Sequence, residues 1–212
     1  MEFKKFKNYD EKELVNEAKQ EIERLKKVLE ATYALGIMGA NGTMSQKEIF
    51  TCFVTDCVYI AGYIAGADGK ISDRELEIAS EIFGDTINMH DFKSYYKTDE
   101  MIRQAYNCAV DDIENNGWFP DFIKIMFQAE LANDRGYEDL SETMDHLIFD
   151  IMFIGIIIAG ADGKRKKSEK KALDKLFTNS EQFFSSKFAY SFNKEARNYL
   201  DDLYQSIPNS LF

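Results

Sequence analysis

Acidic side chains recur at fixed spacing in two parts of this chain. In each copy an Asp lies inside an apolar run, a second Asp ends that run in the block AGADGK, and a Glu follows seven residues later. The acids are Asp56, Asp68 and Glu75 in the first copy and Asp150, Asp162 and Glu169 in the second, at a constant offset of 94 residues. Carboxylates are the ligands that hard divalent cations prefer. All six are therefore candidate metal ligands.

The Asp inside each apolar run is the most unusual of the three. An ionised carboxylate in apolar surroundings is costly unless it is paired, hydrogen-bonded or bound to metal. On a straight helix Asp56 and Asp68 would lie about 18 Å apart, too far to share one ion. Pseudo-twofold packing of the copies would instead bring Asp56 towards Asp162 and Glu169. Two interpretations stay open, a divalent cation held by these acids and acids that only cap helices and form ion pairs.

The turn that follows each apolar run has two interpretations of its own. The first turn, ADGKISDRE, matches the second half of an EF-hand calcium loop, but loop positions 1 and 3 fall on an isoleucine and a glycine, which supply no side-chain oxygen. Helix capping is the alternative, because Ser72 and Glu75 have the spacing of a capping box. Lys166 replaces that serine in the second copy, so capping explains Glu169 less well.

These acids must be positioned by helices. The chain of 212 residues has only two prolines, and its apolar residues recur at helical spacing. Spacing and capping signals predict helices over about 11–36, 46–67, 72–83, 98–115, 120–133, 138–161, 168–177, 181–189 and 194–207. We therefore expect an all-α fold, a compact bundle of about 8–9 helices with an internal pseudo-twofold repeat.

The repeated motif resembles the tellurite-resistance TerB-like family over roughly residues 45 to 180. The matching residues are Ala65, Ala67, Asp68, Gly69, Ile71 and Glu75, and again Ala159, Ala161, Asp162, Gly163 and Glu169. The resemblance implies an all-helical fold of two related halves with acids proposed to bind metal. Such domains occur in bacterial stress-response proteins and in a membrane-anchored J-domain co-chaperone. The second turn departs from the family in carrying Arg165-Lys166-Lys167, where an aliphatic residue and an acid are more usual.

The resemblance and the helix pattern together suggest a domain organisation. We expect an N-terminal helical extension over 1–44, a TerB-like domain of two related halves over 45–180, and C-terminal helices over 181–212 packed on that domain. A degenerate third copy of the turn, GANGTMSQKE, lies at 39–48 with an Asn in place of the acid.

Charge and hydropathy exclude several classes of protein. The formal net charge is −11, which argues against nucleic-acid binding. Three cysteines without a CxxC pair fit a reducing cytoplasm, and the first residues lack the apolar region of a secretory signal. The apolar runs Ile49–Ala67 and Leu147–Ala161 each contain one Asp, so we expect buried core helices and no transmembrane segment.

No catalytic set of residues is evident in the sequence. The only histidines, His90 and His146, lack partners for metal or nucleophilic chemistry, and no phosphate-binding loop occurs. We expect a non-enzymatic stress-response protein that binds a divalent cation, a protein partner, or both. The alternatives are a purely structural interaction scaffold without metal and, more remotely, a metal-dependent hydrolase. The basic stretch Lys164, Arg165, Lys166 and Lys167 predicts contact with an anionic surface, unless it neutralises the neighbouring acids.

Overall fold

The structure, a computed structural model, describes residues 11–34, 45–69, 71–83, 107–132, 137–163, 166–185 and 192–210. Within these ranges the chain is helical and has no strand, which confirms the all-α prediction. The longer helices are α1 (Glu11–Ala34), α2 (Gln46–Ala65), α3 (Asp73–Phe83), α6 (Asp121–Ala132), α7 (Tyr137–Ala159), α8 (Lys167–Ser185) and α9 (Lys194–Ser210). Short 3-10 helices, η1 (Gly66–Asp68) and η4 (Gly160–Asp162), end α2 and α7, and a π-helical turn, η3 (Asp111–Asn115), precedes α6.

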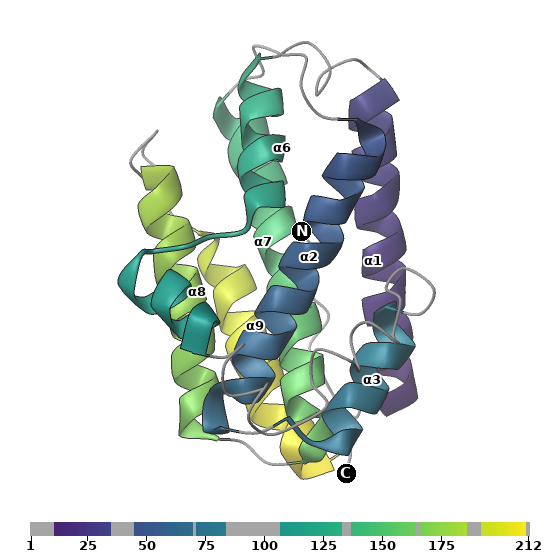
Figure 1. Cartoon of the computed structure of the whole chain (residues 1–212), viewed down its shortest axis with the longest axis vertical. Coiled ribbons are helices and arrows are strands. Elements are labelled where there is room, and N and C mark those ends of the chain that lie inside the picture. Colours follow the sequence, from purple (N-terminus) through teal and green to yellow (C-terminus); the bar gives the residue numbers. More distant parts are fainter. Residues whose placement is uncertain are drawn as a thin grey trace.

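The two repeated apolar helices lie at the centre of the bundle. Figure 1 shows α2 crossing in front of α7, with α1 and α3 on one side and α8 on the other. The segments Lys47–Asp68 and Ser141–Asp162 are long and apolar enough to cross a membrane, yet 73% and 83% of their most apolar windows are buried inside the bundle. In this structure both helices therefore supply the core.

A glycine allows α2 and α7 to approach closely. A Cβ atom added at Gly155 would lie 2.5 Å from Cδ1 of Ile64, a side chain that is itself fully buried. Real Cβ atoms do not approach other atoms so closely in a packed interior. The absence of a side chain at Gly155 thus allows the close approach of the two helices at this crossing.

The two copies of the turn have the same backbone conformation. Gly69 and Gly163 both adopt positive φ angles, 94° and 70°, in the left-handed region that favours glycine. Each donates its backbone N–H to the carbonyl three residues earlier, Gly66 O at 2.9 Å and Gly160 O at 3.1 Å. The sequence repeat is therefore also a structural repeat.

The helices that follow the two turns pack reciprocally. Helix α3, which follows the first turn, contacts η4 of the second copy, and α8, which follows the second turn, contacts η1 of the first copy. This exchange brings together two turns that lie 94 residues apart in the sequence. It creates the setting in which acids from both copies can meet.

The prediction of separate helices over 168–177 and 181–189 is wrong. Helix α8 continues from Lys167 to Ser185, across the domain boundary we placed at residue 180. Thr178, Asn179 and Ser180 separate the two predicted helices, and side chains of this kind can compete for backbone hydrogen bonds. Here the side-chain amide nitrogen of Asn179 donates to Ile113 O and Trp118 O, at 2.7 and 2.8 Å, so both of its N–H groups are used outside the helix. Residues 186–189, and 98–106 of another predicted helix, lie outside the described residues.

Candidate functional site

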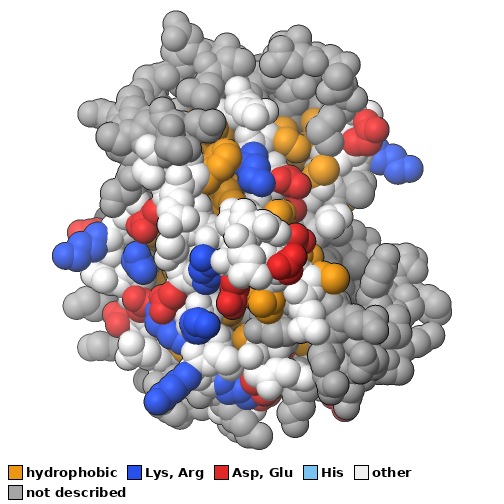
Figure 2. Space-filling model, turned by 60° about the vertical axis from the view of Figure 1, so that its left-hand side comes forward, with side chains coloured by type: hydrophobic (Ala, Val, Ile, Leu, Met, Phe, Trp, Pro, Cys, Tyr) orange, Lys and Arg blue, Asp and Glu red, His pale blue; other side chains and the backbone are white. Residues whose placement is uncertain are grey.

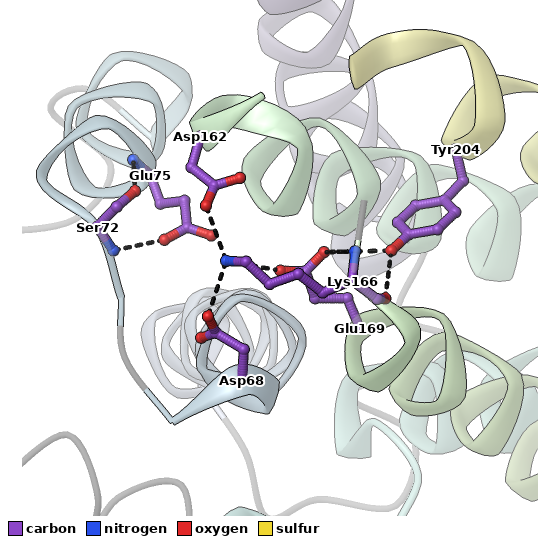
Figure 3. A network of polar contacts seen from close by, with 7 residues as sticks. All are labelled: Asp68, Ser72, Glu75, Asp162, Lys166, Glu169 and Tyr204. Atoms are coloured by element: carbon purple, nitrogen blue, oxygen red, sulfur yellow. Dashed lines mark hydrogen bonds and ion pairs between the residues drawn. The ribbon is translucent and has the colours of Figure 1, made fainter. Parts of the chain in front are cut away.

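A lysine lies at the meeting point of the two repeated turns. The ammonium nitrogen of Lys166 is 2.9 Å from Asp68 Oδ2, 2.8 Å from Asp162 Oδ2 and 3.3 Å from Glu169 Oε1. Figure 3 shows the carboxylate of Glu75 beside the same ammonium. We call these five residues the acidic node. It contains four of the six predicted site residues, two from each copy.

Each glutamate of the node also caps the helix that carries it. Glu75 Oε2 accepts a hydrogen bond from the backbone N–H of Ser72 at 2.5 Å, and Glu169 Oε2 accepts one from the backbone N–H of Lys166 at 3.3 Å. The degenerate third copy of the turn has the same contact, from Ser45 N–H to Glu48 Oε2 at 2.6 Å. Capping therefore accounts for part of the role of Glu169, because the backbone N–H is available whichever side chain stands at the cap position.

Helix α9 closes one side of the node. The hydroxyl of Tyr204 lies 2.8 Å from the carbonyl oxygen of Lys166 and 3.1 Å from Glu169 Oε2, as Figure 3 shows. One helical turn further along α8, Lys170 pairs with Asp174 at 2.8 Å and with Asp201 of α9 at 2.5 Å. The C-terminal helix is thereby fixed to the second copy of the turn.

Burial dominates the electrostatics of the node. Glu75 and Glu169 have no exposed surface, and burial raises the pKa of each from its ordinary value of 4.5 to about 7, even though the charge of Lys166 acts in the opposite direction. Burial alone would lower the pKa of Lys166, but hydrogen bonds to Asp162 and Asp68 and the charge of Glu169 outweigh it and raise that pKa. The lysine is thus held in its charged form.

Two carboxylate oxygens of the node lack hydrogen bonds. Glu75 Oε1 and Glu169 Oε1 are buried, and neither accepts a hydrogen bond from the described part of the chain. The Glu169 atom still has the ion-pair contact of 3.3 Å with Lys166. Buried acceptors without a donor are uncommon and destabilise a fold, so both oxygens require an explanation.

Asp56 lies elsewhere and has a different role. Its Oδ2 atom accepts a hydrogen bond from the backbone N–H of Phe122 at 2.6 Å, so it caps the N-terminus of α6 from the neighbouring helix α2. Burial raises its pKa to about 7, although this hydrogen bond opposes the shift. We expected Asp56 to approach Asp162 and Glu169. Its partner in the structure is instead an unsatisfied helix N-terminus, which binds carboxylates well.

Asp150 is paired with a basic residue from the N-terminal helix. Its Oδ2 atom forms an ion pair with Arg24 of α1, whose guanidinium also contacts Glu21 at 2.7 Å. The two Asp residues inside the apolar runs are therefore equivalent in sequence but not in environment. The ion pair of Asp150 with Arg24 fixes α1 to α7.

Sequence reasoning missed two of the residues that pair with these acids. Arg24 and Tyr204 carried no signal, because nothing local relates them to positions more than 30 residues away. Lys166 did carry one, since it stands at the position of Ser72 beside the acids of the second copy. Lys166 neutralises the node, Lys167 is exposed, and Lys164 and Arg165 lie outside the described residues. Contact of this stretch with an anionic surface stays a prediction.

The carboxylates of the node surround an ammonium rather than converge on one point. Calcium and magnesium bind oxygen at about 2.0–2.6 Å, whereas the distances to the Lys166 nitrogen are 2.8 to 3.3 Å. Among the described residues no group of three or more Asp, Glu, His or Cys side chains is arranged to hold a metal ion. The six residues predicted to bind metal thus occupy three places, the node, the start of α6 and the α1–α7 contact.

Comparisons with known proteins add no relative to this description. No protein-family model, no curated protein and no solved structure matches the chain.

Proposed function

We propose that this chain is a non-enzymatic, TerB-like binding protein that acts as a helical scaffold for a protein partner. In this proposal the acidic node is the contact that joins the two halves of the scaffold. The observation that carries the proposal is the contact of one lysine with three carboxylates from both copies of the turn. An ammonium has three N–H donors, and here it has three carboxylate neighbours. The node then serves to hold the two halves together.

The other acids support a structural role. Asp56 caps α6, Asp150 pairs with Arg24, and both node glutamates cap the helices that carry them. Catalysis by a carboxylate needs a group presented to a substrate, with an acid, base or bound water beside it. These acids are instead directed at backbone N–H groups and basic side chains. A role in a bacterial stress response and a cytoplasmic location remain part of this proposal, on the family resemblance.

A second candidate is direct binding of a divalent cation at the node. It is favoured by Glu75 Oε1, a buried carboxylate oxygen beside the ammonium that accepts no hydrogen bond within the described residues. A cation that displaced Lys166 would provide this oxygen with a partner. The metal-dependent hydrolase, the remaining alternative, would need the same site and a nucleophilic water in addition.

Thermal melting separates the two candidates. A ligand that binds only the folded state raises the melting temperature with its concentration. If the chain is a scaffold whose acidic node is occupied by Lys166, we expect the same melting temperature with EDTA and with millimolar calcium, magnesium, manganese or zinc. A rise that disappears in Asp68→Asn and Asp162→Asn would support the cation instead.

Affinity capture tests the scaffold itself. With the full chain as bait in cells that naturally make it, we expect a protein partner to be recovered in constant ratio to the bait, and recovery should persist in EDTA. The matched control is Gly155→Val, which disturbs the α2–α7 crossing without altering a charge. Recovery of nothing above background with the wild-type bait would contradict the proposed function.

A further inference from the structure

The cation specificity of the acidic node is set, we propose, by Lys166, whose ammonium takes the place between the four carboxylates that a divalent cation would otherwise occupy. The node is then a cation site filled by a group of the chain itself. This inference goes beyond the scaffold function, since it concerns which cations the node accepts, and it holds whatever protein the chain binds.

The donor set is that of a hard-cation site. Four carboxylates come from equivalent positions of the two copies, an Asp that ends each 3-10 helix and a Glu in the first turn of each following helix. Calcium takes six to eight oxygen ligands at about 2.3–2.6 Å. The oxygens around Lys166 lie at 2.8 to 3.3 Å from its nitrogen. After withdrawal of the ammonium, the aspartate oxygens would move inward by about 0.2–0.6 Å and Glu169 Oε1 by about 0.7–1.0 Å to reach the distances of calcium ligands.

An independent observation shows that the ammonium fits this site incompletely. Glu75 Oε1 and Glu169 Oε1 are buried and accept no hydrogen bond from the described residues. A lysine ammonium has three N–H donors, so it cannot donate a hydrogen bond to each of four carboxylates. A divalent ion carries twice the charge and accepts more oxygen ligands. Glu75 Oε1, which accepts no hydrogen bond, and Glu169 Oε1, which has only its ion-pair contact with Lys166, are therefore the oxygens that such an ion would use.

Exclusion by Lys166 is a matter of competition, because the node is not sealed from solvent. The side chains of Lys166, Asp68 and Asp162 retain 19%, 17% and 12% of their surface. An ion from solution can reach the two aspartates. Lys166 belongs to the same chain, three residues before Glu169, so its ammonium acts at a high effective concentration. A free ion must compete with this ammonium for the carboxylates.

The test measures cation affinity in the full chain with and without the lysine. Calorimetric titration with Ca²⁺ and luminescence of Tb³⁺, sensitised by Tyr204 beside Glu169, would be compared between the wild type and Lys166→Met. We expect the variant to bind at least about tenfold more tightly, because affinity rises with the uncompensated charge of the ligands. A second substitution, Asp162→Asn, should remove the gained affinity.

Two further variants keep the result decisive. Lys170→Met is the matched control, since Lys170 pairs with Asp174 and Asp201 outside the node and should leave cation affinity unchanged. Lys166→Gln keeps two N–H donors without charge and provides the measurement if the methionine variant does not fold. Equal affinity of the wild type and both Lys166 variants would overturn the proposal. Absence of binding in all of them would likewise overturn this inference while leaving the scaffold function standing. Tight binding by the wild type would also overturn it and would favour the cation as the ligand of the chain.

Discussion

At the scale of single residues, one sequence pattern has two structural solutions. Asp56 and Asp150 occupy the same position of the repeat, yet one caps the start of α6 and the other pairs with Arg24 of α1. A buried carboxylate needs a positive or hydrogen-donating partner, and the kind of partner is set by whichever element packs against it. The need for a partner could be predicted from the sequence. Its identity could not, since both partners lie in distant segments.

The capping role of Asp56 predicts a specific order of stabilities. Asp56→Ala leaves the backbone N–H of Phe122 buried without an acceptor, so we expect a loss of about 1–3 kcal/mol in the free energy of unfolding. Asp56→Asn keeps an acceptor oxygen and should lose less. Urea denaturation of the three proteins gives both values. Equal losses in the two variants would show that the charge, and not the hydrogen bond, is what the position requires.

Burial of the node glutamates predicts how stability depends on pH. Their pKa values are about 7 in the folded chain and ordinarily 4.5. Between these values the folded state binds more protons than the unfolded state, so the free energy of unfolding falls as pH rises and levels off above about pH 7. Glu75→Gln should make this fall smaller, as measured by urea denaturation between about pH 5 and pH 8.

A matched control for this pH effect exists in the degenerate turn. Glu48 caps its helix in the same way as Glu75, but it is exposed, and a backbone hydrogen bond from Ser45 lowers its pKa. Glu48→Gln should therefore leave the fall in stability between pH 5 and 7 unchanged. An identical effect of both substitutions would mean that capping, rather than burial, controls the titration.

At the scale of helices, periodicity and capping signals predicted most of the observed elements. The apolar face of α1 is buried as its spacing indicated, with Leu14, Ala18, Ile22, Leu25 and Leu29 all in the core. The predicted starts of α2, α3, α7 and α9 are within about one residue of those observed, a difference smaller than the usual uncertainty of helix ends. The prediction failed at residues 178–180, where the side chain of Asn179 finds partners in the η3 region that the local sequence does not reveal.

The close crossing of α2 and α7 predicts a coupled pair of substitutions. Gly155→Ala places a methyl group against Ile64 Cδ1, and overpacking of this kind costs about 1–3 kcal/mol. Ile64→Val removes that atom, so the double variant should be more stable than the sum of the single losses implies. Thermal or urea unfolding of all four proteins measures the coupling.

Gly69→Ala is the control for this cycle. A Cβ atom at Gly69 meets nothing within 4 Å, and its φ angle of 94° alone makes the substitution unfavourable. We expect a loss of about 1–2 kcal/mol that adds to the effect of Ile64→Val without coupling. Additive behaviour at Gly155 as well would contradict the close approach of the two helices.

At the scale of the whole molecule, the segment predicted as an N-terminal extension is attached to the core. Helix α1 contacts α2, α3 and α7, and its Arg24 neutralises Asp150 near the middle of α7. No local sequence pattern relates these two residues, because they lie more than 120 positions apart. Because α1 supplies the basic partner of a buried carboxylate in α7, loss of α1 would destabilise α7. We therefore expect the bundle to unfold as one cooperative unit.

Arg24→Met tests that cooperativity. It leaves Asp150 buried without its cation, and we expect a loss of about 2–3 kcal/mol, below the value for a fully buried pair because the Arg24 side chain is 41% exposed. Two probes report on different regions. Far-UV circular dichroism reports on all helices, and fluorescence reports on the single tryptophan, Trp118, which packs edge-on against Tyr59 of α2. Both transitions should shift together, and Asp150→Asn in the same chain should restore part of the loss. Early loss of helical signal with unchanged fluorescence would instead show that α1 unfolds alone, as an independent extension.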